Sequence, residues 1–266
     1  MNINITLGQY YPAKSPIHSL DPRMKVSLTV LFMVAIFVIR NFWGYAVVAA
    51  FILVVNRLAK VPLSFLLKGL KPLRFVLILT FILNLFLSVG NNVLWSWWIF
   101  TITEDGLVNA LHFSLRLVFL VMGTSLLTLT TTPVTMTDAL ERLLSPLRKI
   151  HFPAHELAMM MTIALRFIPT LLEETQKIMK AQKARGADFE HGNLMERAKA
   201  LVPLLVPLFV SAFRCATDLA NAMEARCYHG GENRTRYHVM KLCKTDFYAL
   251  AITAAMLAAI ILLNAI

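Results

Sequence analysis

The sequence has few charged residues for its length. Only 15% of its 266 residues are Asp, Glu, Lys or Arg, whereas 58% are hydrophobic and the mean hydropathy is +0.64. A water-soluble domain of this size could not bury so much apolar surface. The composition therefore excludes an ordinary soluble protein and indicates a chain that lies largely in lipid.

Acidic residues are scarcer than basic ones. The chain has 15 Asp and Glu against 26 Lys and Arg, a formal net charge of +11. The basic residues follow the predicted topology, so we expect no nucleic-acid partner. They cluster near the N-terminus, between the second and third apolar runs, and in 133–246, whereas the segment between the third and fourth runs has none. The positive-inside rule then predicts a multi-pass protein of the cell membrane, with the N-terminus and 133–246 cytoplasmic and the C-terminus outside.

Cysteine and catalytic motifs are also rare or absent. Cys215, Cys227 and Cys243 are odd in number and lack CxxC spacing, which predicts free thiols in a reducing compartment and no metal site. The sequence contains no GxxxxGK[ST] phosphate-binding loop, no HExxH and no GxSxG. We therefore expect no catalytic residue and no cofactor bound by this chain.

Long apolar runs are abundant. The last three approach the ~20 residues that a helix needs to cross ~30 Å of hydrocarbon. The first two are shorter and meet at Arg40 and Asn41, so we expect two short spans with a tight turn, and a re-entrant hairpin is the alternative. Four spans then occupy residues 1–132 and a fifth occupies 247–266. The apolar runs are residues 24–39, 42–56, 73–90, 107–131 and 247–265.

Residues 133–246 form a second region, which we predict to be a cytosolic domain. Its periodicity predicts two helices, from about 154 to 185 and from about 193 to 226, each ~48 Å long. Both have an apolar stripe at helical spacing. In the first helix the stripe is Leu157, Met161, Ala164, Ile168, Leu171, Ile178 and Ala181; in the second it is Leu194, Ala198, Leu201, Leu205, Leu208, Ala212, Leu219 and Ala222.

The two long helices end alike, in "MKAQKARGAD" (179–188) and "LANAMEARCY" (219–228). An Arg in the last turn and a following Gly are also ordinary helix stops, so two well-terminated helices are the alternative explanation. The match between the endings favours a role in binding a partner. A small Ala lets a partner approach, and Arg offers a rigid charged fork to a carboxylate. Two equivalent ends predict two related cytosolic partners. The matching residues are Ala184, Arg185, Gly186 and Ala225, Arg226, Cys227.

Four segments carry a family resemblance: "SPIHSLDPRMK", "PVTMTDALERLLSPLRKI", "ALRFIPTLLEETQKIMKAQKARGAD" and "ANAMEARCYHGGENRTRY". With them the chain resembles, almost end to end, the transmembrane T component (EcfT) of energy-coupling factor (ECF) transporters. The resemblance implies an all-α integral membrane protein with about five transmembrane helices and a cytosolic coupling module of long crossed helices. The second ending departs from the family's usual Gly or Ala by having Cys227.

The resemblance also implies the function. The subunit would dock its two Ala-Arg ends into two non-identical ABC-type ATPases, which bind ATP and Mg, and would transmit their motion. It would hold an interchangeable substrate-binding membrane S component for vitamin or micronutrient uptake, with no enzymatic activity of its own. One alternative is the T component of a dedicated cobalt/nickel or biotin importer with one fixed substrate subunit. Another is an integral-membrane enzyme with 133–246 as catalytic domain, which the mostly basic, water-facing residues there disfavour.

Further residues are candidates for contacts within the coupling module or with a partner. Arg116, the charged residue inside the fourth apolar run, either extends its side chain to the outer membrane boundary or contacts the membrane partner. The motif "LRFIP" has two explanations. It could be a helix kink with an Arg at the membrane interface, or it could serve the packing between the two long helices. The methionine run could be an adaptable surface, with plain helix packing as the simpler account. These candidates are Arg116, Arg166, Pro169, Met159, Met160 and Met161.

Overall fold

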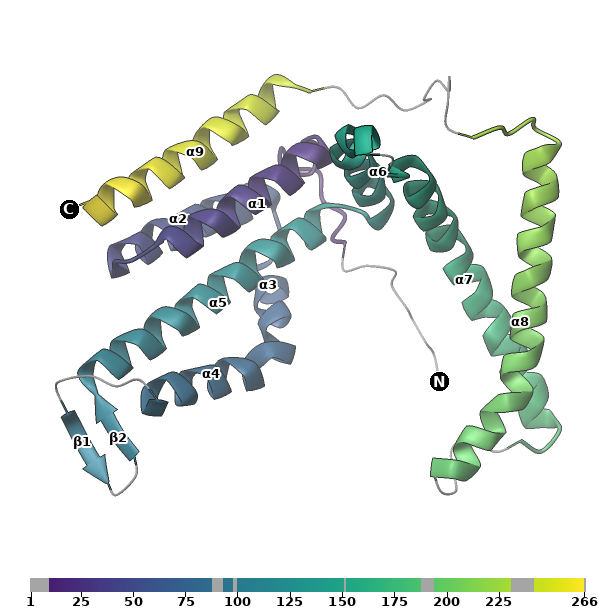
Figure 1. Cartoon of the computed structure of the whole chain (residues 1–266), viewed down its shortest axis with the longest axis horizontal. Coiled ribbons are helices and arrows are strands. Elements are labelled where there is room, and N and C mark those ends of the chain that lie inside the picture. Colours follow the sequence, from purple (N-terminus) through teal and green to yellow (C-terminus); the bar gives the residue numbers. More distant parts are fainter. Residues whose placement is uncertain are drawn as a thin grey trace. The chain divides into compact units, whose positions relative to one another are not determined.

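The computed structural model describes residues 10–87, 93–97, 100–150, 152–187, 194–230 and 242–265. The chain divides into two compact units, which we call the bundle unit (Met1–Ala139 with His238–Ile266) and the long-helix unit (Leu140–Tyr237). Nearly all of the described structure is helical (Figure 1). The elements are α1 (Pro22–Val38), α2 (Phe42–Ala59), α3 (Leu63–Leu70), α4 (Arg74–Leu87), β1 (Val93–Trp97), β2 (Phe100–Thr103), α5 (Glu104–Thr130), α6 (Pro133–Leu144), α7 (Ala154–Ala184), α8 (Leu194–Glu224) and α9 (Lys244–Ala265).

The first two helices are separate and joined by a tight turn, as predicted. Asp21 caps α1 by accepting a hydrogen bond from the Arg23 N–H, and Pro22 occupies the first helical position, where no N–H is needed. Ile39 and Asn41 are extended and end one helix before the next begins. The chain therefore does not run through Arg40 as one long helix.

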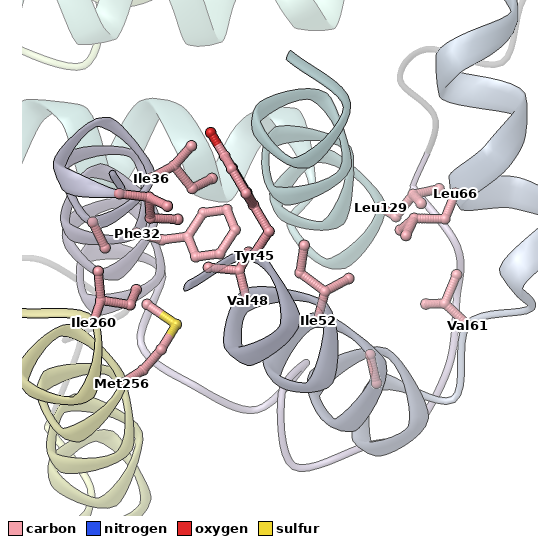
Figure 2. Close-up of a cluster of buried hydrophobic side chains, with 13 residues drawn as sticks. Phe32, Ile36, Tyr45, Val48, Ile52, Val61, Leu66, Leu129, Met256 and Ile260 are labelled. Atoms are coloured by element: carbon pink, nitrogen blue, oxygen red, sulfur yellow. The ribbon is translucent and has the colours of Figure 1, made fainter. Parts of the chain in front are cut away.

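The core of the bundle unit lies where α1, α2, α5 and α9 meet (Figure 2). α5 packs against α1, α2, α3 and α4, while α9 packs against α1 and α2. Gly123 of α5 lets α1 approach closely, because a Cβ there would lie 2.3 Å from the Phe32 ring. The buried core residues are Phe32, Ala35, Ile36, Ile39, Tyr45, Val48, Ile52, Ala59, Val61, Leu66, Leu129, Met256 and Ile260.

The third predicted run corresponds to α4, which is described from Arg74 to Leu87. A 3₁₀ segment at Lys71–Leu73 separates α3 from α4, and α4 has 14 residues. At 1.5 Å per residue this described part is ~21 Å long. Residues 88–90 of the predicted run lie outside the described residues.

The tryptophan-rich segment forms a short antiparallel hairpin, which we did not predict. β1 pairs with β2, and a register shift lies between Val93 and Trp95. Trp98 lies outside the described residues. The Oγ1 of Thr103 then caps α5 by accepting the Gly106 N–H.

Five of the described helices are long and apolar enough to cross a membrane: α2, α5, α7, most of α8 and α9. This set differs from the five predicted runs. α1 has 17 residues and α4 has 14, whereas α7 and α8, which we predicted to be cytosolic, have span-like hydropathy. The class is nevertheless the predicted one, a multi-pass helical membrane protein with further long helices.

A buried carboxylate joins the N-terminal segment to α9. Asp246 is 1% exposed, and its two oxygens accept the N–H groups of Asp21 at 2.9 Å and Cys243 at 2.7 Å. Beside it, the Lys25 ammonium donates to the Thr130 carbonyl at 3.0 Å. Since buried polar groups need partners, this network specifies how α1, α5 and α9 meet.

Candidate partner-docking site

The long-helix unit is built on α7 and α8, which run antiparallel and cross (Figure 1). Near one end, the Gln182 side chain donates to the Pro203 carbonyl at 3.4 Å. Near the other, Ile163 and Phe167 of α7 line the same small cavity as Leu219 and Met223 of α8. The C-termini of the two helices therefore lie at opposite ends of the pair.

The predicted stripes match the face that joins the helices only in part. The predicted Leu171, Ala212 and Leu219 line the cavity between the helices. Ile163 and Phe167, which lie outside the predicted stripe, line it too, whereas the predicted Leu157 and Met161 are 36% and 46% exposed. On α8 the predicted Leu205 is likewise 45% exposed. The helices are apolar on more than one side, so periodicity alone could not choose the face that pairs within the chain.

Equivalent positions of α7 and α8 lie at corresponding levels of the antiparallel pair. Arg185 and Arg226 are 41 residues apart in the sequence. By the same spacing, Gln182 of α7 is equivalent to Met223 of α8. These two residues occupy matching places, Gln182 against Pro203 and Met223 beside Ile163. The short sequence echo between the helices thus corresponds to matching places in an antiparallel pair.

The end of α7 is a Schellman cap. Arg185 is the C-cap residue, and Gly186 follows in the left-handed region with φ +91°. The Gly186 N–H donates to the Lys183 carbonyl and the Ala187 N–H to the Gln182 carbonyl, both at 3.0 Å. These are the two hydrogen bonds that define the motif.

The end of α8 repeats this cap. The Cys227 N–H donates to the Glu224 carbonyl at 2.9 Å, and the Tyr228 N–H to the Met223 carbonyl at 3.1 Å. Cys227 has φ +54°, so it takes the left-handed place of Gly186. The cap itself therefore requires a left-handed backbone at the third position of each ending. A non-glycine residue there costs about 1–2 kcal/mol.

Both arginines are presented to the outside of the fold. Arg185 and Arg226 are exposed, as are the alanines before them. Among the described residues, neither guanidinium makes a hydrogen bond or an ion pair. The stretch that begins in α8 opposite Arg185 and ends at Arg226 has about 25 residues. At 1.5 Å per residue it separates the two arginines by about 38 Å. The unit therefore offers two matched, exposed guanidinium groups at opposite ends of the helix pair.

The remaining candidates lie elsewhere. In the bundle unit, Arg116 donates to the Ile39 carbonyl at 3.2 Å and lies over the Phe37 and Phe113 rings, so it already has partners within its own chain. On α7, several candidates are distant from the tip. Arg166, Pro169, Met160 and Met161 are exposed there, and Met159 is half-buried.

These features define a class: a multi-pass helical membrane protein whose second unit is a crossed pair of long helices with matching ends. Comparison with known proteins identifies the family. The model of the cobalt transport protein family (CbiQ) matches residues 13–237. The protein is 56% identical over 249 residues to the energy-coupling factor transporter transmembrane protein EcfT of Thermosediminibacter oceani, with 94% of each chain covered. The EcfT proteins of Clostridium kluyveri and Bacillus subtilis are 53% and 51% identical, with 92% and 88% of each chain covered. The chain belongs to this family of transporter transmembrane components.

Proposed function

We propose that this chain is the scaffold and coupling subunit of an ECF-type ABC importer. In this proposal, two cytosolic ATPases bind at Arg185 and Arg226, and a separate membrane S component captures a vitamin or another micronutrient. The α7–α8 pair transmits the closure of the ATPases to that partner. The transporter name of the relatives supports this kind of assembly.

The observation that supports the proposal best is the pair of matched helix caps. Each presents an Arg at the same cap position, and the two caps have the same hydrogen bonds and the same left-handed residue. A pair of related subunits could receive both tips in equivalent sockets. Arg suits such a socket because its planar fork binds a carboxylate through two hydrogen bonds, whereas Lys offers a point charge.

The apolar surface of the long helices supports a membrane-side partner. Met160 of α7 is 54% exposed, and Phe209 and Phe213 of α8 are 61% and 71% exposed. Exposed apolar patches rimmed by polar residues are typical of surfaces that bind protein or lipid. We assign this surface to the S component and the adjoining bilayer, and the exposed methionines suit a surface that accepts several partners.

The topology follows from charge. The basic residues favour a cytoplasmic location for the N-terminus and for 133–246, and an external C-terminus. In this arrangement α7 and α8 lie at the cytoplasmic surface despite their span-like hydropathy. Their 31 residues each extend ~46 Å, well beyond a ~30 Å hydrocarbon layer, and both contain internal prolines.

This subunit acts without chemistry of its own. The sequence has no phosphate-binding loop, so ATP and Mg would be bound by the partner ATPases, and the purified chain alone is expected to show no ATPase activity. Mechanical coupling requires stiff elements and partners with two states, and two long helices meet the first requirement.

One observation favours a second candidate. The matching family model is described as a cobalt transport protein, which suits a dedicated importer with one fixed substrate subunit. Pull-down from mild detergent separates the two functions. Several different S components retained by one scaffold indicate the shared system, whereas a single one indicates the dedicated system.

The test of the main proposal reverses the charge of both tips. We expect Arg185→Glu with Arg226→Glu to release the ATPases and abolish uptake, while the protein still inserts into the membrane. Arg214→Glu is the matched control, because it changes the charge of an exposed α8 residue away from the tip. Co-purification of the double variant with ATPases at wild-type yield would contradict the proposal.

A further inference from the structure

The C-terminal ends of the two helices, which we call the α7 tip (residues 177–187) and the α8 tip (residues 218–228), have the same backbone conformation but different charges. The last turns of α7 contain Lys177, Lys180 and Lys183 before the cap, and all three are exposed. With Arg185, residues 177–187 have four positive charges and no negative one. Lys177 has one loose neighbour, Glu174, with 3.8 Å between the charged atoms at an exposed position.

The same positions on α8 have the opposite character. With the same spacing of 41 residues, Lys177 is equivalent to Asp218 and Lys183 is equivalent to Glu224, and both acidic residues are exposed. Residues 218–228 therefore have two negative charges and one positive, that of Arg226. The correspondence that holds for the caps and the Arg is broken at the charges around them.

We propose that these charges assign each tip to its own partner subunit. The α7 tip fits a protein socket with carboxylates around the site that receives Arg185. The α8 tip fits a socket that is neutral or basic around the site that receives Arg226. This inference rests on the proposed docking function and adds the rule by which two different ATPases are told apart.

The physical reason is specificity by repulsion. Two identical caps with identical arginines would bind either socket alike, so a scaffold with uncharged tips could assemble with two copies of one subunit. Placing like charges against each other at an interface is costly and suppresses the wrong pairing, while opposite charges speed the right one. Lys183 and Glu224 lie ~3 Å along the helix axis from their Arg, within the ~8 Å over which charges act at physiological salt. Lys177 and Asp218 lie ~12 Å along the axis from it, so they act on the rim of a socket around the Arg.

The experiment exchanges the tip charges without touching either Arg. One variant, Lys177→Asp with Lys183→Glu, gives the α7 tip the α8 pattern. A second, Asp218→Lys with Glu224→Lys, does the reverse. Lys177→Arg with Lys183→Arg preserves the charge and is the matched control. Charges in 188–193 and 231–237 are the same in all variants.

The readout is the ratio of two differently tagged, co-expressed ATPases that co-purify with the full chain, measured by quantitative mass spectrometry. Wild type and the Lys→Arg control should retain both at about equal amounts. Each charge variant should lose or replace one ATPase, a different one in each case, with a shift of about fivefold or more in the ratio. An unchanged ratio in both variants would overturn the inference while leaving the docking function intact. Wild type that retains no ATPase would overturn both.

A second arm tests a membrane role for the lysines. The same complexes are assembled in nanodiscs of phosphatidylcholine alone and with phosphatidylglycerol. The proposed protein socket predicts the same change of ratio in both. A change that appears only with the anionic lipid would mean that Lys177 and Lys183 contact headgroups, and it would overturn the inference.

Discussion

The two matched helix caps respond in opposite ways to substitution at their left-handed position. At Gly186, φ is +91° and a Cβ would find no atom within 4 Å, so Gly186→Ala adds backbone strain without a steric clash. At Cys227, φ is +54° with a Cβ already present, so Cys227→Gly removes strain. The first change should destabilise its cap, and the second should stabilise its own.

The size of both effects follows from the backbone. A residue with a Cβ in the left-handed helical region is disfavoured by about 1–2 kcal/mol relative to glycine. Since every 1.4 kcal/mol is a factor of ten, the opening equilibrium of each cap should change by about 5- to 30-fold. Glycine's extra freedom in the unfolded chain reduces the gain for Cys227→Gly, which should fall at the lower end.

The assay is amide hydrogen exchange of the full chain in detergent, read at the amides that close the caps. Exchange at Ala187 should quicken in Gly186→Ala, and exchange at Tyr228 should slow in Cys227→Gly, because each of these amides follows the left-handed residue and donates the bond that closes the cap around it. Gly186→Asn is a graded control, because Asn tolerates the left-handed region better than Ala does.

The reasoning would be refuted by either of two results. Unchanged protection of Ala187 in Gly186→Ala would show that the left-handed backbone is not what Gly186 supplies. Faster exchange at Tyr228 in Cys227→Gly would show that the Cys227 side chain stabilises the cap through contacts that outweigh its strain.

Three further predictions concern the bundle unit and use thermal unfolding in detergent. Asp246→Ala should destabilise the unit by about 1–3 kcal/mol, because it leaves the buried Asp21 N–H and the partly buried Cys243 N–H without their acceptor; a melting temperature equal to wild type would contradict this. Gly123→Val should lower stability by about 1–3 kcal/mol or more, because its Cβ would meet the Phe32 ring, and Phe32→Ala should restore part of the loss. Burial lowers the pKa of His18 below its ordinary value of 6.5, an effect that the positive charge of Lys25 increases and the hydrogen bond to the Tyr11 carbonyl opposes. The unfolded chain then binds the proton more readily, so the stability from His18 should be present above pH 6.5 and fall as the pH drops through the lowered pKa, and His18→Gln should flatten that dependence.

Much of the architecture was predictable because its causes are local. Asp21 followed by Pro22 is a helix start by capping alone, and polar residues around Arg40 end a helix wherever the chain goes. The long helices were found from periodicity to within a residue or two at each end. The family, too, followed from contiguous segments that need no knowledge of packing.

Other features were not predictable because they depend on what the chain packs against. The tryptophan-rich segment has no strand-like alternation in its sequence, and its hairpin forms because Val93–Trp97 pairs with Phe100–Thr103. The face of α7 that joins α8 could not be read from an apolar pattern present on several sides. Arg116 looked like a lone charge in a span until α1 brought the Ile39 carbonyl within reach.

By itself the sequence determined that this is a multi-pass helical membrane protein with two like-ended long helices, because hydropathy, capping and charge act over neighbouring residues. Only the tertiary structure decided that those ends lie at opposite ends of the helix pair, that each has the same type of backbone cap and that their arginines are exposed. An antiparallel crossing brings together residues about 20 to 60 apart, and no local pattern specifies such a contact.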